Sequence, residues 1–348
     1  MRPAQSVNLT ASVIVATRNR ADYLTECLRR LADQRCQEQF EVIVIDNDSM
    51  DDTPKVIEEW MRKNPQLRTF RETRIGLSAA KNAGARLAKG RLLIFTDDDV
   101  LMESNWLEAY LDWFARIADT NVLVGGPIVP VLNDLQPWPH WFDEQGLAEM
   151  GLLHYGVERR LMDWEYVWGA NMALPAALFE RVGPWNEGVG RRGEERGTFE
   201  DTEYQDRVRA IGATVWFCPD LGLRHRIEPD RLRTRNLIQV AFNRGRNTFV
   251  LETLHSGRAN VKTRVTRIIP AVAALAINVV SWTWWTLLFR MIRSRSLFVR
   301  TRIGAFLSGN KLERMRAGRD SSRMIYIIAR VTFVWRDLIL RLVSNDFN

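Results

Sequence analysis

The chain has little of several features that mark specialised classes of protein. Its three cysteines, Cys27, Cys36 and Cys218, form neither a metal-ligand spacing nor an even set for disulfides, which favours a reducing compartment. With 21 glycines and 12 prolines in 348 residues, the chain is neither collagen-like nor of low complexity. Its first twenty residues lack a basic stretch followed by a long apolar core, which argues against a cleaved signal peptide.

The composition that is present belongs to a globular protein with an uneven charge. Apolar residues make up 46% and charged residues 26% of the chain, which excludes a wholly disordered protein. Residues 255–348 hold 17 Lys and Arg against 4 Asp and Glu, whereas the remainder holds 32 against 38. The net charge of +7 therefore comes from a basic tail, which suits either nucleic acid or an anionic membrane surface.

Short apolar runs alternate with helical patterns in the first half of the chain. Expected strands lie at Ser12–Ala16, Glu41–Ile45, Leu67–Phe70 and Arg91–Phe95, and expected helices at Ala21–Ala32, after Asp52 and Thr53, and at Gly76–Ala88. This alternation predicts βαβ units in an α/β fold, with a mixed, mostly parallel sheet flanked by helices. Ligands bind beyond the carboxyl ends of such strands, where Asp46 and Asp97–Asp99 lie.

The pattern is less regular after residue 126. Residues 127–165 are rich in proline and tryptophan, and we expect loops over the sheet there. Further on we expect a strand at Trp168–Leu174, helices at Ala176–Val182 and Phe199–Ile211, a charged loop at Gly188–Gly197, and a last strand at Thr214–Cys218, followed by His225.

The basic tail contains one long uncharged run. Ile268–Phe289 has 22 residues without a charge, enough for about 33 Å of helix and thus for a bilayer core of about 30 Å. Met324–Val343 is apolar but broken by charges, as in an interfacial helix. Because the tail's arginines flank apolar runs, a membrane is favoured over nucleic acid. The sequence predicts a domain over residues 1–257 and a helical membrane-associating tail over 258–348, which either crosses the membrane or lies in it.

Carboxylates follow two of the expected strands. Asp97, Asp98 and Asp99 repel one another unless a cation neutralises them, and Mg²⁺ and Mn²⁺ prefer oxygen ligands. Asp46 is placed to accept hydrogen bonds from a nucleobase or a ribose hydroxyl. A solvated acidic turn and an Asx turn are the ordinary structural alternatives.

A further acidic pair begins an expected helix. Glu200 and Asp201 follow the charged loop, and a carboxylate in a defined position can deprotonate a hydroxyl. Acidic residues are also common at helix N-termini because they favour the helix dipole, so a structural role stays open.

Taken together, these segments resemble the family-2 glycosyltransferases, which have the GT-A fold. The resemblance covers roughly residues 10–250 and rests on the order and spacing of SVIVATRNRADYLTECLRRL, VIVIDNDSMDDT, GLSAAKNAGARLAKGRLLIFTDDDV and WGANMALPAALFERVGPWNEGVGRRGEERGTFEDTEYQDRVRAIG. It implies a nucleotide-sugar-binding half at about residues 10–125 and an acceptor-binding half at 126–257.

The resemblance implies roles for residues of the nucleotide half. Asp46 binds the base, Asp97 and Asp99 form the DXD pair, with Asp97 toward the ribose and Asp99 on a divalent metal, either manganese or magnesium. The other expected nucleotide-sugar contacts are Thr17, Arg18, Lys81 and Asp98.

In the acceptor half, the same resemblance makes Asp201 the general base and Glu200 its supporting neighbour in an ED motif. His225 lies where many GT-A enzymes place a late metal ligand, although a lone histidine is equally often structural. The sugar and acceptor region is expected at Trp168, Gly169, Ala170 and Asn171.

Two departures from the family pattern lie near the nucleotide. Arg74 stands where the family often has Asn, two positions before the glycine of GLS. The first loop reads Ala16-Thr17-Arg18-Asn19 in place of the frequent Pro–x–Tyr–Asn. Uracil is the expected base, and these departures leave its identity open.

The resemblance implies an inverting, metal-dependent transferase with a nucleotide-diphosphate sugar as donor, expected to be a UDP-sugar. The acceptor is a hydroxyl of a surface glycan or a glycolipid, with a polyprenyl-phosphate acceptor as the alternative. The protein is then membrane-associated with a cytoplasmic catalytic domain, and nucleic acid is not a partner. A nucleotidyltransferase or an inert GT-A scaffold are the other hypotheses, and the ED motif and the intact carboxylates argue against them.

Overall fold

The structure is a computed structural model, and it describes residues 9–117, 119–132, 137–138, 147, 150–191 and 199–232. The chain divides into the units Met1–Arg231 and Leu232–Asn348, and all but the first residue of the second lies outside the described residues. The predictions for Ile268–Phe289, for Met324–Val343 and for a boundary at residue 257 fall outside them too. None of the helices in the described part of the chain is both long and apolar enough to cross a membrane.

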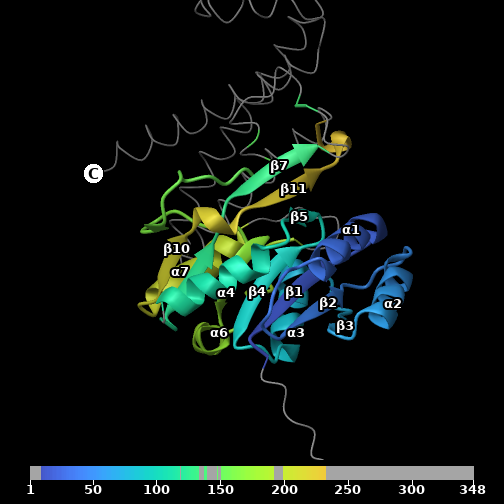
Figure 1. Cartoon of the computed structure of the whole chain (residues 1–348), viewed down its shortest axis with the longest axis horizontal. Coiled ribbons are helices and arrows are strands. Elements are labelled where there is room, and N and C mark those ends of the chain that lie inside the picture. The colour runs from blue at the N-terminus through green and yellow to red at the C-terminus, as the bar shows by residue number, and fades with distance from the viewer. Residues whose placement is uncertain are drawn as a thin grey trace, which may run out of the picture. The chain divides into compact units, whose positions relative to one another are not determined.

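A mixed sheet forms the centre of the described unit, with the order β3-β2-β1-β4-β9-β6-β10-β8 (Figure 1). Its strands are β1 (Ala11–Thr17), β2 (Phe40–Asp46), β3 (Leu67–Arg71), β4 (Leu92–Asp97), β6 (Val122–Gly125), β8 (Arg160–Leu161), β9 (Asn171–Pro175) and β10 (Thr214–Phe217). The four strands β3, β2, β1 and β4 run parallel, whereas β9 runs antiparallel to both of its neighbours. Three of them, β1, β2 and β4, are buried on both faces and therefore have nearly continuous apolar sequences, whereas the edge strand β3 is largely exposed.

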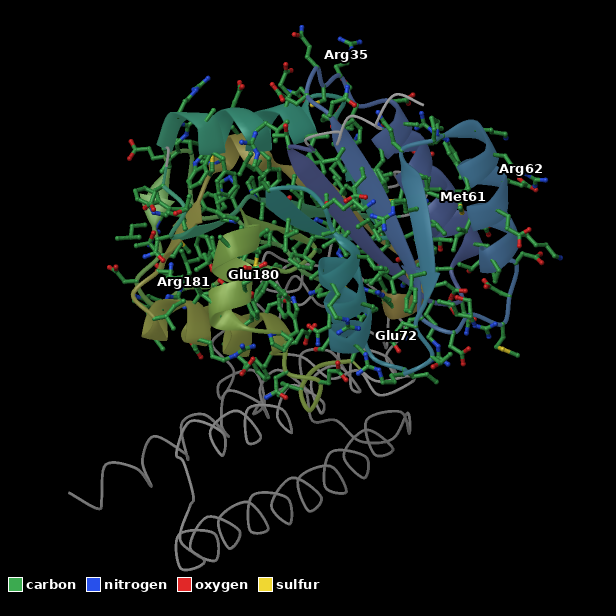
Figure 2. The ribbon with its side chains drawn as sticks, turned by 90° about the horizontal axis from the view of Figure 1, so that it is seen from below. Arg35, Met61, Arg62, Glu72, Glu180 and Arg181 are labelled. Carbon is green, nitrogen blue, oxygen red and sulfur yellow. The ribbon has the colours of Figure 1, made fainter. Side chains whose placement is uncertain are left out.

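Helices cover both faces of this sheet. They are α1 (Ala21–Ala32), α2 (Thr53–Lys63), α3 (Leu77–Leu87), α4 (Trp106–Ile117), α6 (Ala176–Val182) and α7 (Glu200–Ala210). α1, α2 and α4 lie on one face, and α3, α6 and α7 lie on the other (Figure 1, Figure 2). α3 approaches the sheet closely because Gly84 has no side chain, and a Cβ there would lie 2.3 Å from Ile14.

A second, three-stranded sheet has the order β5-β11-β7, with β5 at Val100–Met102, β7 at Ile128–Leu132 and β11 at Leu223–Ile227. This sheet corrects two expectations. Residues 127–165 are not loops throughout, because they contain β7. β7 includes Pro130, which is tolerated because β7 lies at the edge of its sheet. The strand at Thr214–Phe217 is not the last, since His225 lies within β11 and does not merely follow β10.

Candidate active site

Carboxylates gather at the carboxyl ends of the three central parallel strands. In the register of the sheet, Thr17 of β1 lies opposite Asp46 of β2, and Ala16 lies opposite Asp97 of β4. Three separate segments of sequence therefore end side by side. This is the edge at which ligands bind in open α/β sheets.

A pocket of about 330 Å³ opens at this edge. Polar and charged side chains dominate its wall, with three carboxylates facing three arginines. Its lining consists of Ala16, Thr17, Arg18, Asn19, Arg20, Asn47, Gly76, Leu77, Ala80, Asp97, Asp98, Asp99 and Arg191. Such a wall suits a polar, charged ligand better than an apolar one.

Asp98 is held by neighbours from β1 and the loop after it. Thr17 donates a hydrogen bond from Oγ1 to Asp98 Oδ2 at 2.7 Å, and Arg20 donates to Asp98 Oδ1 at 2.9 Å. Burial and the neighbouring Asp99 raise the pKa of Asp98 to about 6, although Arg20 opposes the shift. Thr17 and Asp98, both expected at this edge, are thus in direct contact, and both oxygens of Asp98 are engaged by neighbouring side chains.

Asp99 pairs with His225 from the second sheet. His225 Nε2 lies 3.2 Å from Asp99 Oδ1, while its Nδ1 lies 3.2 Å from the carbonyl oxygen of Met150. Arg20 forms an ion pair with Asp99, and Arg231 lies 3.8 Å away. Burial alone would raise the pKa of Asp99, but His225, Arg20 and Arg231 hold that pKa well below its usual range.

Asp97 has a buried oxygen, Oδ1, without a hydrogen-bond partner among the described residues. Burial and the nearby Asp99 raise the pKa of Asp97, whereas Lys81 and Arg191 lower it. Within the described ranges, no three His, Cys, Asp or Glu side chains are grouped as a complete metal site. What the structure provides is a pair, Asp99 and His225, with an unpartnered carboxylate oxygen of Asp97 on the same strand end.

Asp46 lies at the end of β2 opposite Thr17 and outside the pocket lining, whereas Arg18 belongs to the lining. Asp46 is buried and accepts a hydrogen bond from the backbone N–H of Ser49 at 2.9 Å, which is an Asx turn. Its other oxygen is not used in this turn. Arg18 lines the pocket, and its Nε has no hydrogen-bond partner among the described residues.

Asp201 forms the centre of a second polar group. Its Oδ1 lies 3.0 Å from Lys81 Nζ of α3, and its Oδ2 accepts a hydrogen bond from the backbone N–H of Gly169 at 2.7 Å. A Cβ on residue 169 would lie 2.2 Å from Asp201 Oδ1 and 2.3 Å from Lys81 Nζ. Glycine is therefore required at this position by the pair itself.

Lys81 is almost fully buried, and its ammonium lies 4.3 Å from the ring centroid of Trp185. Burial alone would lower the pKa of Lys81, but Asp201, Glu200 and Asp97 raise it. The sequence placed Lys81 near the nucleotide or its phosphates. In the structure its ammonium forms an ion pair with Asp201, and the charge of Asp97 also acts on it.

Glu200 is the first residue of α7 and directly precedes Asp201. The residue before it, Phe199, has φ of 85°, a left-handed conformation that is uncommon for a side chain of this size. Burial and the charge of Asp201 raise the pKa of Glu200 to about 7, although Lys81 opposes this. Glu200 is thus a buried acid with little access to a ligand.

The WGAN turn divides between surface and core. Gly169 contacts Asp201, and the carbonyl oxygen of Ala170 accepts a hydrogen bond from Thr96 Oγ1 at 2.9 Å, next to the carboxylates of β4. Asn171 is fully buried, and its side chain is engaged with Trp106, Tyr110, Pro127 and Leu221. Trp168 is partly buried. The contact of the turn with Asp201 is made by the backbone N–H of Gly169.

Several pocket residues had not been singled out from the sequence. Arg20 neutralises Asp98 and Asp99, and Arg191 lines the pocket from the loop before α7. Asn47 joins β2 to the start of α3, because its Oδ1 accepts a hydrogen bond from Gly76 N at 2.8 Å. The run Asp97–Asp99 was the feature of the sequence that could have pointed to these arginines, because three adjacent carboxylates require cations nearby.

The comparisons with known proteins agree with this geometry. Residues 12–182 match the model of glycosyl transferase family 2, a range that contains Asp46, Lys81, Asp97–Asp99 and the WGAN turn. The described unit has the α/β architecture of the GT-A class, with a mixed sheet flanked by helices and a carboxylate-lined edge. Residues 12–182, just under half of the chain, are thus similar to a glycosyltransferase family 2 domain.

Curated relatives cover parts of the chain. Validoxylamine A glucosyltransferase of Streptomyces hygroscopicus subsp. jinggangensis is 31% identical over 223 residues, which are 58% of this chain and 51% of that protein. Glucosyl-dolichyl phosphate glucuronosyltransferase of Haloferax volcanii is 24% identical over 181 residues, 52% of this chain and 57% of that protein. The chain spans about half the length of the curated relatives it matches first.

Two solved structures share the fold. A mannosyltransferase from Pyrobaculum calidifontis, in complex with GDP-Man and Mn²⁺, superposes with a TM-score of 0.55 at 23% identity, covering 95% of this chain and 88% of that one. GalNAc-T7 with UDP, GalNAc and Mn²⁺ superposes with a TM-score of 0.50 at 20% identity, covering 63% and 43%. At these identities the likeness concerns the fold.

Proposed function

We propose that the protein is a metal-dependent inverting glycosyltransferase that moves a sugar from a nucleotide-diphosphate sugar to an acceptor hydroxyl. One observation supports this most. Asp201, restrained by Lys81 and Gly169, stands at the same sheet edge as the Asp97–Asp99 pocket, close enough for its charge to act on Asp97. A donor pocket and a fixed carboxylate beside it are the parts that base-assisted transfer needs.

A divalent cation fits the donor pocket chemically. His225 Nε2 faces Asp99 Oδ1 at 3.2 Å while Nδ1 lies beside the carbonyl oxygen of Met150, an orientation in which Nε2 and Oδ1 could share one cation. The unpartnered Oδ1 of Asp97 adds an oxygen ligand on the same strand end. Asp99 and His225 would hold Mn²⁺ or Mg²⁺, which when bound offsets the negative charge of a departing diphosphate.

The step itself is assigned to residues of this chain. The acceptor oxygen forms a bond to the anomeric carbon while the bond from that carbon to the diphosphate oxygen breaks. The electron pair of the broken bond leaves with the diphosphate, and the proton of the hydroxyl passes to the carboxylate of Asp201. Because the attack comes from the face opposite the leaving group, the anomeric configuration inverts.

Nucleotide recognition is assigned to the edge of β1 and β2. Asp46 has one oxygen left for a base N–H after its turn to Ser49, and Asp97 is nearest the ribose in this proposal. Thr17 and Asp98 are bound to each other and shape the wall, while Arg18 faces the pocket. A UDP-sugar is the donor that we propose, and the relative from Pyrobaculum calidifontis, solved with GDP-Man, makes GDP-sugars the first competitor.

The names of the two relatives indicate different kinds of acceptor. One has a validoxylamine as its named acceptor, and another is named for a glucosyl-dolichyl phosphate. The uncharged run Ile268–Phe289 and the basic tail favour a lipid-linked acceptor or a surface glycan made at a membrane. We propose that residues 258–348 hold the protein to the membrane with its catalytic domain in the cytoplasm, where nucleotide sugars are made.

The test is a donor-hydrolysis and transfer screen of the full chain in detergent across UDP-, GDP-, dTDP- and CMP-sugars, with Mn²⁺, Mg²⁺ or a chelator. The proposal expects turnover of one nucleotide-diphosphate sugar that the chelator abolishes. Anomeric inversion is read by NMR of the product. Binding of nucleotide without turnover of any sugar would favour an inert scaffold, and neither binding nor turnover would overturn the assignment altogether.

A further inference from the structure

Residues 183–191 lead from the end of α6 toward α7, and we call them the 183–191 segment. The segment ends at the donor pocket, because Arg191 is one of the lining residues. Arg191 is exposed, and it lines the same pocket as Asp97, Asp98 and Asp99. Its guanidinium therefore belongs to the wall that a donor bound in this pocket would meet.

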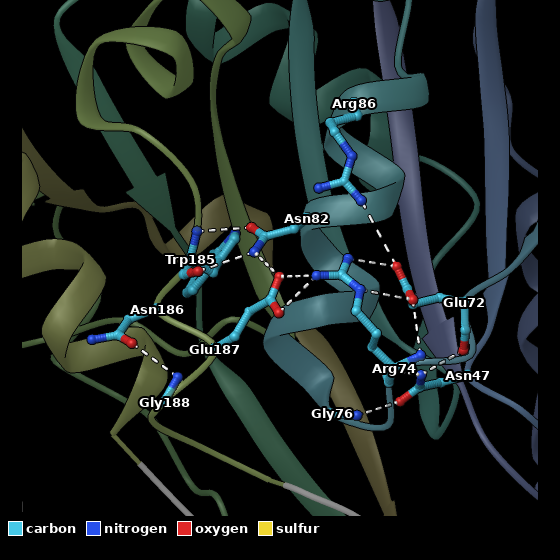
Figure 3. Close-up of polar contacts among 10 residues, drawn as sticks. All are labelled: Asn47, Glu72, Arg74, Gly76, Asn82, Arg86, Trp185, Asn186, Glu187 and Gly188. Carbon is cyan, nitrogen blue, oxygen red and sulfur yellow. Dashed lines mark hydrogen bonds and ion pairs between the residues drawn. The ribbon is translucent and has the colours of Figure 1, made fainter.

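The start of the segment is fastened to α3. Asn82 donates a hydrogen bond from Nδ2 to the carbonyl oxygen of Trp185 at 3.0 Å and accepts one at Oδ1 from Trp185 N at 2.8 Å (Figure 3). The Trp185 ring in turn stacks on Tyr204 of α7, with centroids 4.1 Å apart. These contacts tie the segment to two helices of the domain.

The far end of the segment is fastened to the first turn of α3. Ser78 Oγ donates to the carbonyl oxygen of Val189 at 3.2 Å, and Leu77 N donates to the carbonyl oxygen of Arg191 at 3.0 Å. The backbone of Arg191 is thus fixed at the N-terminus of a helix whose first residues, Gly76 and Leu77, also line the pocket.

An ion bridge holds the middle of the segment. Arg74 Nη1 lies 3.0 and 2.9 Å from the two carboxylate oxygens of Glu187, and its Nη2 lies 2.8 Å from Glu72 (Figure 3). Glu187 also accepts from Asn82 at 3.1 Å. Arg74 does not line the pocket, so its charge stabilises the 183–191 segment through Glu187 and does not contact a ligand in the pocket.

We propose that Arg191 binds the diphosphate of the donor, and that the Arg74–Glu187 bridge is a positioning device for it. Three carboxylates in the pocket wall repel a diphosphate, and Arg20 is already paired with Asp98 and Asp99. Arg191 has no ion pair with a described residue, and a guanidinium can donate two parallel hydrogen bonds to a phosphate. This inference rests on the proposed function, and it adds a phosphate contact from outside the DXD strand.

The test uses the full chain and binding of inorganic pyrophosphate, UDP and GDP in the presence of Mn²⁺, measured by calorimetry. Arg191→Ala should weaken all three by about tenfold or more, the usual scale for a charge-assisted contact. Asp46→Asn, which keeps an acceptor for Ser49 N, should weaken UDP or GDP but leave pyrophosphate unchanged. Arg62→Ala removes an exposed arginine on the outer side of α2 and serves as the matched control (Figure 2).

The bridge is tested by its own variants. Glu187→Gln keeps the acceptor for Asn82 but loses the charge, and it should weaken pyrophosphate binding by about threefold, in line with a partly exposed ion pair. Arg74→Lys keeps a positive charge between Glu187 and Glu72 and should retain most of the affinity, whereas Arg74→Met should lose about as much as Glu187→Gln. A difference in pyrophosphate affinity between these two Arg74 variants, with thermal unfolding measured in parallel, separates positioning from a general loss of structure.

The outcomes separate the two proposals. If the wild-type chain binds UDP or GDP and Arg191→Ala binds pyrophosphate equally well, the diphosphate contact is wrong and the transferase proposal stands. If Glu187→Gln has no effect, or Arg74→Met binds pyrophosphate as well as Arg74→Lys does, the positioning role is wrong. If the wild-type chain neither binds a nucleoside diphosphate nor turns over a nucleotide sugar, both proposals fail.

Discussion

The two ends of the site handle buried charge in opposite ways. At the proposed donor end, three consecutive carboxylates at the end of β4 and in the turn after it face Arg20, Arg231 and His225, and an oxygen of Asp97 still lacks a partner among the described residues. At the proposed acceptor end, the carboxylate of Asp201 has both oxygens engaged, by Lys81 and by the N–H of Gly169. The donor end therefore has capacity for a further cation, whereas both oxygens of Asp201 already have partners.

The two ends also differ in how the chain assembles them. The donor carboxylates are neighbours in sequence, at the end of β4 and in the short turn between β4 and β5. Lys81 and Asp201 are 120 residues apart and meet because α3 and α7 cover the same face of the sheet. The first arrangement concentrates charge for a ligand, and the second orients one group through contacts from separate elements.

The largest expected effect falls on the donor end. Asp99→Ala should abolish transfer and weaken nucleotide binding mainly when Mn²⁺ is present, because it removes the carboxylate that pairs with His225. The measurement is UDP and GDP affinity with metal and with chelator. Asp98→Asn is the control, since Asp98 is bound to Thr17 and Arg20 and should retain most of the metal-dependent affinity. Near-wild-type turnover in Asp99→Ala would refute the metal assignment.

The acceptor end should show the reverse split. Asp201→Asn keeps an acceptor for Gly169 N but cannot take a proton, so kcat should fall by a factor of about 10² or more while the donor dissociation constant stays within about threefold. Single-turnover kinetics with the full chain separate the two quantities. Loss of donor binding in Asp201→Asn would assign this carboxylate to the donor instead.

The local parts of this comparison could be predicted from the sequence. The helix expected at Ala21–Ala32 is found with those bounds. β1, β2 and β3 extend the expected runs by one or two residues, and β4 begins one residue later and ends two residues later than expected. The carboxylates stood out because they follow apolar runs directly. Both are local signals, since periodicity and strand ends are properties of neighbouring residues.

The parts that depend on distant pairing could not be predicted. β11, with the sequence LRHRI, has three charged or polar residues, and β7 contains Pro130, so neither has the pattern of a buried strand. Their pairing is set by residues about 95 positions apart. Likewise Arg74 was noted only as a departure from the family pattern, and its partner Glu187 lies 113 residues further on.

A smaller effect should follow from removing the cation at the acceptor end. Lys81→Met fills a similar volume but leaves Asp201 and Glu200 without their ammonium, so the acid limb of the kcat–pH profile should move to higher pH. The unfolding temperature should also fall, because breaking a buried pair destabilises by about 2 kcal/mol or more. Lys55→Met removes an exposed lysine paired with Asp52 and should change neither quantity. An unchanged pH profile in Lys81→Met would show that the pair is structural only.

The smallest effect concerns the buried carboxyl group of Glu200, which lies next to Asp201. Its pKa of about 7 in the folded protein lies above the ordinary 4.5, because burial and Asp201 disfavour the carboxylate. The folded state therefore binds the proton more tightly than the unfolded state does. The stabilising contribution of this proton is fully present below about pH 4.5 and is lost as the pH rises through about 7.

Glu200→Gln keeps the neutral shape and removes that titration. Relative to wild type, its free energy of unfolding should rise between pH 4.5 and 8 by at most about 3 kcal/mol, the linkage value for a shift of this size. Urea unfolding of the two full-length chains at matched pH values measures the difference. Turnover should fall less than in Asp201→Asn, because Glu200 is buried under the reacting carboxylate. A stability difference that is flat across this range would mean that Glu200 is ionised in the folded protein, and the charge at the acceptor end would then not be balanced by Lys81 alone.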